Sequence, residues 1–310
     1  MEYLPISLII VTYNRKDDLD FTLSKIFNCF NIAEIIVINN ASTDGTEKLV
    51  EFKYPNCKLI NLDKNYGVPS FNKGAQIATQ PFIFFLDDDA IPEKDTINIV
   101  INNFLENPNI HVIACNIIDN SNTSITENWA LNPICFWGCG VGIRKSILIN
   151  HPYLYDNRLF LHGTEMDFAI RVYSKGGLIL YLKEAIIYHR FSSENRSQEK
   201  RIYYLVQSAF IFAFKHFPYK YLFIILFRHL IYLLYKSLKH HCFISFYKGL
   251  LLSCKELKLT LKDRNVVPKK IAKRYYLNVW EYEPLIFRLC RFFIDKPLHR
   301  KYKQQIKNWK

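Results

Sequence analysis

The stretch PFIFFLDDDAIP, residues 81–92, places three adjacent carboxylates directly after an apolar run. Asp87, Asp88 and Asp89 repel one another where water is scarce, so the cluster needs a positively charged partner. Residues 81–86 have the length and composition of a buried strand. Carboxylates at a strand end are typical ligands of a hard divalent cation that completes its shell with phosphate oxygens. A polar turn that caps the next helix is the alternative interpretation of these residues taken alone.

Other apolar runs of strand length surround this one, and amphipathic segments with helical spacing separate them. Continuous apolar strands that alternate with helices predict an α/β fold, a mainly parallel Rossmann-like sheet covered by helices on both faces. Residues 117–163 show no regular pattern. The predicted strands are 7–12, 34–39, 57–62, 81–86, 111–115, 178–182 and 185–189, and the predicted helices are 17–30, 70–78, 95–105 and 165–177.

Polar residues follow each of the first four predicted strands. Ligands of open parallel sheets bind at the carboxyl ends of the strands, so these residues are expected to gather at one edge. One polar cluster can be turn chemistry, and an Asx-turn is the alternative role for Asp44. Four clusters at the same edge instead indicate a nucleotide site. The residues are Thr12, Tyr13, Asn14 and Arg15 after the first strand, Asp44 after the second, Asn65, Gly67 and Asn72 after the third, and the three aspartates after the fourth.

The net charge of +13 is distributed unevenly along the 310 residues. Residues 1–200 carry 18 basic against 23 acidic side chains, a net charge of −5, whereas residues 201–310 carry 23 against 5, a net charge of +18. We therefore expect a catalytic domain over 1–200 and a helical, basic and aromatic extension over 201–310. A protein that binds nucleic acid over its whole surface is not indicated, because the basic excess belongs to one part of the chain.

The eight cysteines form no C-x-x-C pair, and the histidines show no zinc-finger spacing. Such cysteines are typical of reduced thiols in a cytosolic protein. The N-terminal residues have no basic segment before their short apolar run and no cleavage site after it, so they do not indicate a signal peptide.

Residues 219–241 are the most apolar part of the extension, but Arg228 and His229 interrupt them in the middle. A membrane span needs about 20 uninterrupted apolar residues. An interfacial helix on the cytoplasmic face of the membrane is the preferred interpretation, with lysine and arginine towards anionic headgroups. A helical cap packed on the catalytic domain is one alternative, and a nucleic-acid-binding segment is another.

Six sequence blocks occur in a recognisable order along the chain. They are SLIIVTYNR, NNASTDGT, NYGVPSFNKGA, FLDDDAIP, GCGVGIRKS and TEMDFAIR. With these blocks the sequence resembles the family 2 glycosyltransferases of the GT-A fold over roughly residues 5–193. The resemblance implies a bacterial surface polysaccharide as the product.

The resemblance implies roles for the strand-end residues. Thr12, Tyr13, Asn14 and Asp44 would hold the base and ribose, and an aspartate that accepts from an imide N–H favours UDP or dTDP. Asn65, Gly67 and Asn72 match the third block. Asp89 would hold Mn²⁺ or Mg²⁺, and Asp87 would lie near the ribose or the metal. Asp88 joins the nucleotide-sugar candidates, although strand alternation points it to the opposite face. His189 is a further metal candidate, or a structural histidine.

The resemblance also implies a catalytic base, which takes the proton of the acceptor hydroxyl. Glu165 falls on that position, although Thr164 replaces the usual preceding acid and glutamate replaces the commoner aspartate. A favourable charge in the first helical turn is the alternative role for Glu165. Trp137 and Gly138 are implied to line the acceptor and sugar region together with Glu165, and Trp129 and His162 are weaker candidates.

The resulting hypothesis is an inverting, metal-dependent glycosyltransferase that moves a sugar from a nucleotide-diphosphate sugar to a saccharide or lipid-linked acceptor. A sugar-1-phosphate nucleotidyltransferase is one alternative, but its glycine-rich N-terminal loop is missing. A non-catalytic membrane- or RNA-binding protein on a transferase scaffold is the other, and the intact aspartates and Glu165 argue against it.

Overall fold

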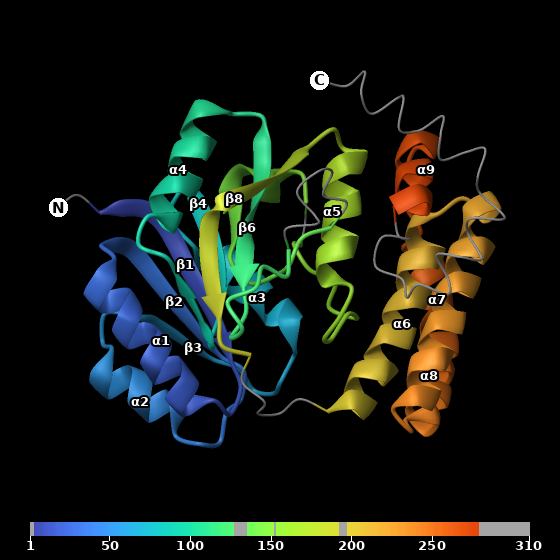
Figure 1. Ribbon diagram of the computed structural model, residues 1–310, viewed down its shortest axis with the longest axis horizontal. Helices are drawn as coiled ribbons and strands as arrows, with labels where there is room; N and C mark the ends of the chain where they lie inside the picture. Colours follow the sequence, from blue (N-terminus) through green and yellow to red (C-terminus); the bar gives the residue numbers. More distant parts are fainter. Residues whose placement is uncertain (1–2, 127–134, 152, 192–196, 279–310) are drawn as a thin grey trace.

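The computed structural model describes residues 3–126, 135–151, 153–191 and 197–278. One sheet of eight strands forms the centre of the molecule, in the order β3-β2-β1-β4-β7-β6-β8-β5 (Figure 1). The strands are β1 (Leu4–Thr12), β2 (Ile32–Asn39), β3 (Lys58–Asn61), β4 (Phe82–Asp87), β5 (Ala90–Pro92), β6 (Ile110–Ile118), β7 (Val141–Arg144) and β8 (Leu178–His189).

The register of the parallel strands places their carboxyl ends side by side. Thr12 of β1 lies beside Asn39 of β2, and Asn39 lies beside Asn61 of β3. On the other side of β1, Val11 pairs with Asp87 of β4. The polar residues that follow these strands therefore leave the sheet at the same edge.

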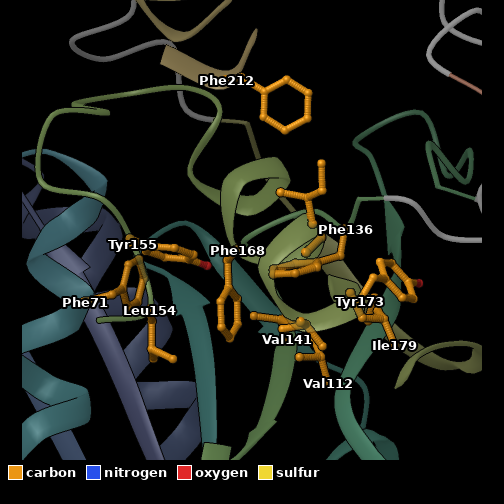
Figure 2. Packing of buried hydrophobic residues seen from close by; sticks show 14 of the residues in the cluster. Phe71, Val112, Phe136, Val141, Leu154, Tyr155, Phe168, Tyr173, Ile179 and Phe212 are labelled. Carbon is orange, nitrogen blue, oxygen red and sulfur yellow. The ribbon is translucent and has the colours of Figure 1, made fainter. Parts of the chain in front are cut away.

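Helices cover both faces of the sheet, as the alternation of side chains along β1 requires. Leu8 and Ile10 point into a core with α1 and α4, whereas Ile9 points into the core on the opposite face with α3 and α5 (Figure 1). Figure 2 shows the second core, where the Phe168 ring of α5 lies edge-on to Phe136. The helices around the sheet are α1 (Lys16–Cys29), α2 (Thr46–Lys53), α3 (Phe71–Ile77), α4 (Thr96–Glu106) and α5 (Thr164–Ser174), with short 3₁₀ turns at Val68–Ser70 and Lys145–Ile149.

Four further helices stand beside α5, on the side away from the sheet (Figure 1). Phe212 of α6 belongs to the same buried cluster as Phe168, so this helical group shares the core of the catalytic part. Within the described residues, α7 is the helix long and apolar enough to cross a membrane, although about a quarter (28%) of its most apolar window is already buried in the protein. The helices are α6 (Gln198–His216), α7 (Tyr219–Lys239), α8 (Phe243–Lys262) and α9 (Lys269–Asn278).

The predicted α/β fold with a mainly parallel sheet and a C-terminal helical extension is confirmed, with several differences in detail. The short strand β5, which pairs antiparallel with β8, was not predicted. The irregular segment contains β7, which pairs antiparallel with β4 and β6. The two late strands form one strand, β8, whose register shifts opposite Cys115 and Asn116. The helix predicted from residue 70 begins at Phe71, and Ser70 does not cap it with its side chain, because the Ser70 hydroxyl donates to the Gly67 carbonyl at 2.7 Å.

The thiols agree with the expectation of reduced cysteines. The seven cysteines in the described part of the chain are free, and Cys115, Cys139 and Cys242 are buried. Cys290 lies outside the described residues.

Candidate active site

Three aspartates at the end of β4 form the centre of the site, and each has a different environment. The Asp87 side chain is about one-third exposed (36%), whereas the Asp89 side chain is fully buried. Asp88 is buried on the β1 side, where the Thr12 hydroxyl donates to its carboxylate at 2.8 Å. The Thr12 hydroxyl is a partner of Asp88, whereas Arg15 contacts both Asp88 and Asp89.

Arg15 supplies a positive charge to the two buried carboxylates. Its guanidinium lies 3.0 Å from Asp88 Oδ1 and 3.3 Å from Asp89 Oδ2. Burial raises the pKa of Asp88 to about 7, even though Arg15 and the Thr12 hydroxyl favour the ionised form. Arg15 contacts two of the three carboxylates, and its single positive charge leaves an excess of negative charge that suits a cation.

His189, at the end of β8, faces the same aspartates. Its Nε2 lies 3.2 Å from Asp87 Oδ2 and 3.5 Å from Asp89 Oδ1. The backbone N–H of Phe191 donates to Nδ1 at 3.0 Å, which places the hydrogen of a neutral ring on Nε2, directed at Asp87. Asp87, His189 and the buried Cys139 bring potential ligand atoms within 4.8 Å of one another.

Glu165 lies in the first turn of α5, close to the Asp87 carboxylate. Burial and the charge of Asp87 raise the pKa of Glu165, while the Gly138 N–H and the Thr164 hydroxyl, at 2.8 Å, oppose the shift. A methyl group at Gly138 would meet Glu165 Oε1 at 2.5 Å. Position 138 therefore admits the carboxylate only because it lacks a side chain.

The loops after β1 and β2 bind each other. The Thr43 N–H donates to Asn14 Oδ1 at 2.7 Å, and the Ser42 hydroxyl accepts from the Asn14 N–H at 2.9 Å. Asp44 accepts from the Lys16 N–H at 2.9 Å and from the Thr46 hydroxyl at 2.6 Å. Asp44 thus makes the local turn contacts that its alternative role requires, and it remains solvent-exposed at the strand edge.

The loop after β3 is held by residues of its neighbours. The Asn65 side-chain oxygen accepts from the Gly67 N–H at 2.8 Å. Gly67 has φ +68°, and a Cβ there would lie 1.9 Å from the Phe160 carbonyl oxygen, so no larger residue fits. Asn72 is buried and clamps the backbone of Tyr155, with its amide donating to Tyr155 O at 2.7 Å and its oxygen accepting from Tyr155 N at 2.9 Å.

The remaining predicted residues lie around this centre. Tyr13 is half-buried at the end of β1. The Trp137 ring lies edge-on to Phe191, which stacks on His189, so Trp137 borders the aspartate cluster. Burial and the charges of Arg201 and Lys236 lower the pKa of His162 to about 4, which places His162 towards α6 and α7. Trp129 lies outside the described residues.

Arg15 was among the predicted strand-end residues, but its pairing with Asp88 and Asp89 was not predicted. Several other residues of the site were not singled out from the sequence. Asn40 carries only the weak signal of a second asparagine at the end of β2; its side chain joins the loop after β3 by donating to Asn65 Oδ1 at 2.9 Å. Tyr155, Cys139, Lys215 and His216 have no local pattern that separates them from core residues.

The comparisons with known proteins agree with this geometry. The glycosyl transferase family 2 model matches residues 7–168, which is more than half of the chain and includes the ends of β1, β2, β3 and β4 and the first turn of α5. The chain belongs to glycosyl transferase family 2. The similar curated proteins include the poly-β-1,6-N-acetyl-D-glucosamine synthase of Staphylococcus epidermidis, 30% identical over 115 residues. That match covers 36% of this family 2 chain and only 28% of the synthase.

Solved structures confirm the GT-A fold expected for the family. S. aureus TarS 1–349 in complex with UDP-GlcNAc is similar with a TM-score of 0.53 and 19% identity, over 65% of this chain and 64% of that one. The mannosyltransferase PcManGT from Pyrobaculum calidifontis, in complex with GDP-Man and Mn²⁺, has a TM-score of 0.56 and 16% identity. It covers 91% of this family 2 chain and is itself covered over 89%.

Proposed function

We propose that this family 2 chain transfers a sugar, with inversion, from a nucleotide-diphosphate sugar to a hydroxyl of a saccharide or lipid-linked acceptor in surface polysaccharide synthesis. The observation that carries the proposal is that the β4 aspartates and Glu165 lie close together at one edge of the sheet. The aspartates of β4 suit a cation and a diphosphate, and Glu165 of α5, beside Asp87, suits a proton acceptor.

The donor is proposed to be a UDP- or dTDP-sugar, held by the loops after β1, β2 and β3. Asp44 Oδ2 accepts one hydrogen bond, from the Lys16 N–H, and so retains a lone pair for an imide N–H of uracil or thymine. The similar proteins TarS and poly-N-acetylglucosamine synthase support UDP-GlcNAc as the first donor to test.

The donor set fits Mn²⁺ or Mg²⁺. Asp87 and Asp89 offer hard oxygen ligands and excess negative charge, as these ions prefer. Burial and the nearby Asp87 raise the pKa of the Cys139 thiol well above its ordinary value, which makes it a poor ligand. His189 directs its Nε2 hydrogen at Asp87, so we propose that His189 orients the Asp87 carboxylate. His189 Nε2 can bind the cation only if this hydrogen moves to Nδ1. A bound cation would neutralise the diphosphate leaving group.

The chain's own residues then account for the proton transfer. The acceptor oxygen forms a bond to the anomeric carbon while the bond from that carbon to the diphosphate oxygen breaks, and the acceptor proton passes to Glu165. A raised carboxylate pKa improves a general base, because the proton affinity of the carboxylate increases. The Thr164 hydroxyl and the Gly138 backbone hold the carboxylate in place for this step.

Replacing Asp87 by asparagine is expected to remove the effect of metal on nucleotide binding. Loss of one carboxylate weakens the cation site and leaves the loops that hold the base intact. We expect the Kd for UDP in the presence of Mn²⁺ to rise at least about tenfold. Titration calorimetry and thermal shifts of the full chain with UDP, dTDP, GDP and CDP, each with Mn²⁺ or with EDTA, measure the change.

Glu106→Gln is the matched control, because Glu106 is exposed at the end of α4. This variant should bind UDP with Mn²⁺ like the wild type. Equal UDP affinity for the wild type in Mn²⁺ and in EDTA would contradict the metal assignment. Stabilisation by GDP or CDP but not by UDP or dTDP would contradict the proposed donor class.

We further propose that the cytoplasmic face of an anionic membrane binds one side of α7. Leu222, Ile225 and Leu226 pack α7 onto the protein. A second apolar face has one residue every three or four positions, and its side chains are between 36% and 66% exposed. Helix α7 is therefore apolar on two faces but packed against the protein on one. This α7 stripe consists of Tyr219, Phe223, Phe227, Ile231, Tyr235 and Leu238.

The positive charge around the α7 stripe favours an anionic lipid surface as its binding partner. Residues 219–278 contain 13 lysines and arginines against 2 acidic residues, a net charge of +11. Exposed apolar residues continue past the end of α7 to Phe243, Ile244 and Tyr247 of α8. Aromatic and aliphatic side chains flanked by lysines suit the boundary between acyl chains and anionic headgroups.

The double substitution Phe223→Glu/Phe227→Glu should reduce binding to vesicles of phosphatidylglycerol and phosphatidylcholine at least about tenfold, because burying each phenylalanine contributes about 2 kcal/mol. Sedimentation of the full chain with the vesicles gives the bound fraction. Phe52→Glu is the control, since Phe52 is 84% exposed on α2. Equal sedimentation of the double variant and Phe52→Glu would contradict the α7 surface.

A further inference from the structure

Arg15 places a permanent positive charge inside the aspartate cluster. Its guanidinium lies 3.0 Å from Asp88 Oδ1 and 3.3 Å from Asp89 Oδ2, and its side chain is only 14% exposed. Arg15 directly precedes α1, and its carbonyl accepts from the Leu19 N–H at 3.0 Å in the first helical turn. The helix therefore holds the backbone of Arg15, and a change of carboxylate partner requires only its side chain to move.

The two oxygens of Asp89, a proposed metal ligand, each face a nitrogen atom. Oδ2 faces Arg15, and Oδ1 lies 3.5 Å from Nε2 of His189. Asp88 lies closer to Arg15 than Asp89 does, and the Thr12 hydroxyl holds Asp88 in place at 2.8 Å. Because a guanidinium does not lose its proton in proteins, a cation that binds Asp89 competes with Arg15. The longer contact, to Asp89, is the one that Arg15 loses more easily.

From these contacts we infer that Arg15 makes cation binding depend on the nucleotide diphosphate. Without nucleotide, Arg15 occupies Asp89 and repels a divalent cation. The diphosphate of UDP adds negative charge at the same strand end, so Arg15 and the cation are both stabilised there. Without Arg15, the carboxylates would bind the cation more tightly in the absence of nucleotide. The inference rests on the proposed function and adds a positioning residue that couples the metal to the donor.

The test measures Mn²⁺ binding to the full chain with and without UDP, by titration calorimetry and from the electron paramagnetic resonance signal of free Mn²⁺. For Arg15→Gln without UDP, we expect the Kd for Mn²⁺ to fall at least about tenfold relative to the wild type, because a like charge next to the site is removed. UDP should tighten Mn²⁺ binding to the wild type by a factor of about 10–100. This factor should be at least about fivefold smaller in Arg15→Gln.

The thermal stability of Arg15→Gln gives a second readout. The variant leaves Asp88 and Asp89 without their arginine, so it should melt at a lower temperature than the wild type in EDTA. Mn²⁺ without nucleotide should raise this melting temperature more than it raises that of the wild type, because the cation supplies the missing charge. If Arg15→Gln does not fold in EDTA, it should fold in Mn²⁺ for the same reason.

Two variants are the controls. Arg15→Lys keeps the positive charge, so its Kd for Mn²⁺ without UDP should stay within about threefold of the wild-type value. Lys25→Gln removes the same charge from an exposed position on α1, where solvent and salt screen it. Its Mn²⁺ binding should match that of the wild type, with and without UDP.

Three outcomes would overturn the role of Arg15. They are unchanged or weaker Mn²⁺ binding by Arg15→Gln without UDP, equal tightening in Arg15→Gln and Lys25→Gln, and an Arg15→Gln chain that stays unfolded in Mn²⁺. A wild-type chain whose affinity for UDP is the same in Mn²⁺ and in EDTA would instead contradict the metal site of the proposed function, and the inference with it.

Discussion

Glu165→Gln is expected to lower kcat by about 10²–10⁴-fold, the contribution typical of a general base, and to leave the Kd for UDP with Mn²⁺ unchanged. Glutamine keeps the shape of the side chain beside Gly138 but cannot accept the proton of the acceptor hydroxyl. Because the pKa of Glu165 is raised by burial, wild-type activity should fall as the pH decreases through this raised value and the carboxylate becomes protonated. Steady-state UDP release across pH 5 to 9 measures both effects.

Glu106→Gln serves again as the control for the same chemical change, and it should retain the wild-type kcat and pH profile. The glutamine variant should lose the acid limb of the profile, since no carboxylate remains to titrate there. Normal turnover of Glu165→Gln would place the base elsewhere. A parallel loss of UDP affinity would instead show that Glu165 supports the nucleotide site rather than the proton transfer.

The sequence was most informative where strands end. Parallel strands deliver their carboxyl ends to one edge, so Thr12, Asp44 and the three aspartates could be placed together from periodicity alone. The strand β7 was not predicted because it has four residues and two glycines in it or directly before it, which leaves no apolar run to recognise. Long-range pairing with β4 and β6, rather than local preference, makes this segment a strand.

The partners of the predicted residues were harder to infer than the residues themselves. The sequence showed that the three aspartates need positive charge but did not identify its source. Arg15 supplies part of it by pairing with Asp88 and Asp89, and the remaining negative charge favours a cation. Asn72 was expected at the nucleotide and clamps the backbone of Tyr155, which is 83 residues away in the sequence. No spacing rule connects a residue of α3 with a distant loop that it meets only after the sheet has formed.

Lys215 and His216 show the same limit in the C-terminal helices. They lie in an apolar stretch, FIFAFKHFP, where a lysine is expected to be solvated. In the structure Lys215 is buried, and its Nζ lies 2.7 Å from Asp156 Oδ2 and 2.6 Å from Asp167 Oδ1. His216 Nε2 lies 2.7 Å from the same Asp167 oxygen. These contacts join the final turn of α6 to Asp167 in the first turn of α5, and Asp167 lies two residues after Glu165.

Lys215→Met should lower the free energy of unfolding by about 3–5 kcal/mol, the usual cost of removing one partner from a buried ion pair. Methionine fills the space, but the carboxylates of Asp156 and Asp167 lose a shared positive charge in a region closed to water. Lys258→Met, an exposed position on α8, is the control and should change stability by less than about 0.5 kcal/mol. Urea denaturation of each variant at pH 7 gives the values.

Acid should reduce the difference between Lys215→Met and the wild type. The wild-type pKa of Asp167 is held well below its ordinary value by Arg171, His216 and Lys215 in spite of burial, and that of Asp156 is lowered by Arg158 and Lys215. A lowered carboxylate pKa stabilises the fold above the unfolded value, near about 4, and this stability is lost as the pH falls below it. The stability gap should therefore narrow between pH 5 and pH 3.

Adding Asp156→Asn to Lys215→Met should recover part of the lost stability, because it removes one uncompensated carboxylate while Arg158 keeps Asp263 as a partner at 3.3 Å. Strictly additive losses in the double variant would show that Lys215 contributes packing and not charge. The kcat of Lys215→Met, measured where the variant is still folded, should fall together with its stability if α6 positions Glu165 through Asp167. An unchanged kcat in a destabilised variant would mean that the network holds the helices together without orienting the base.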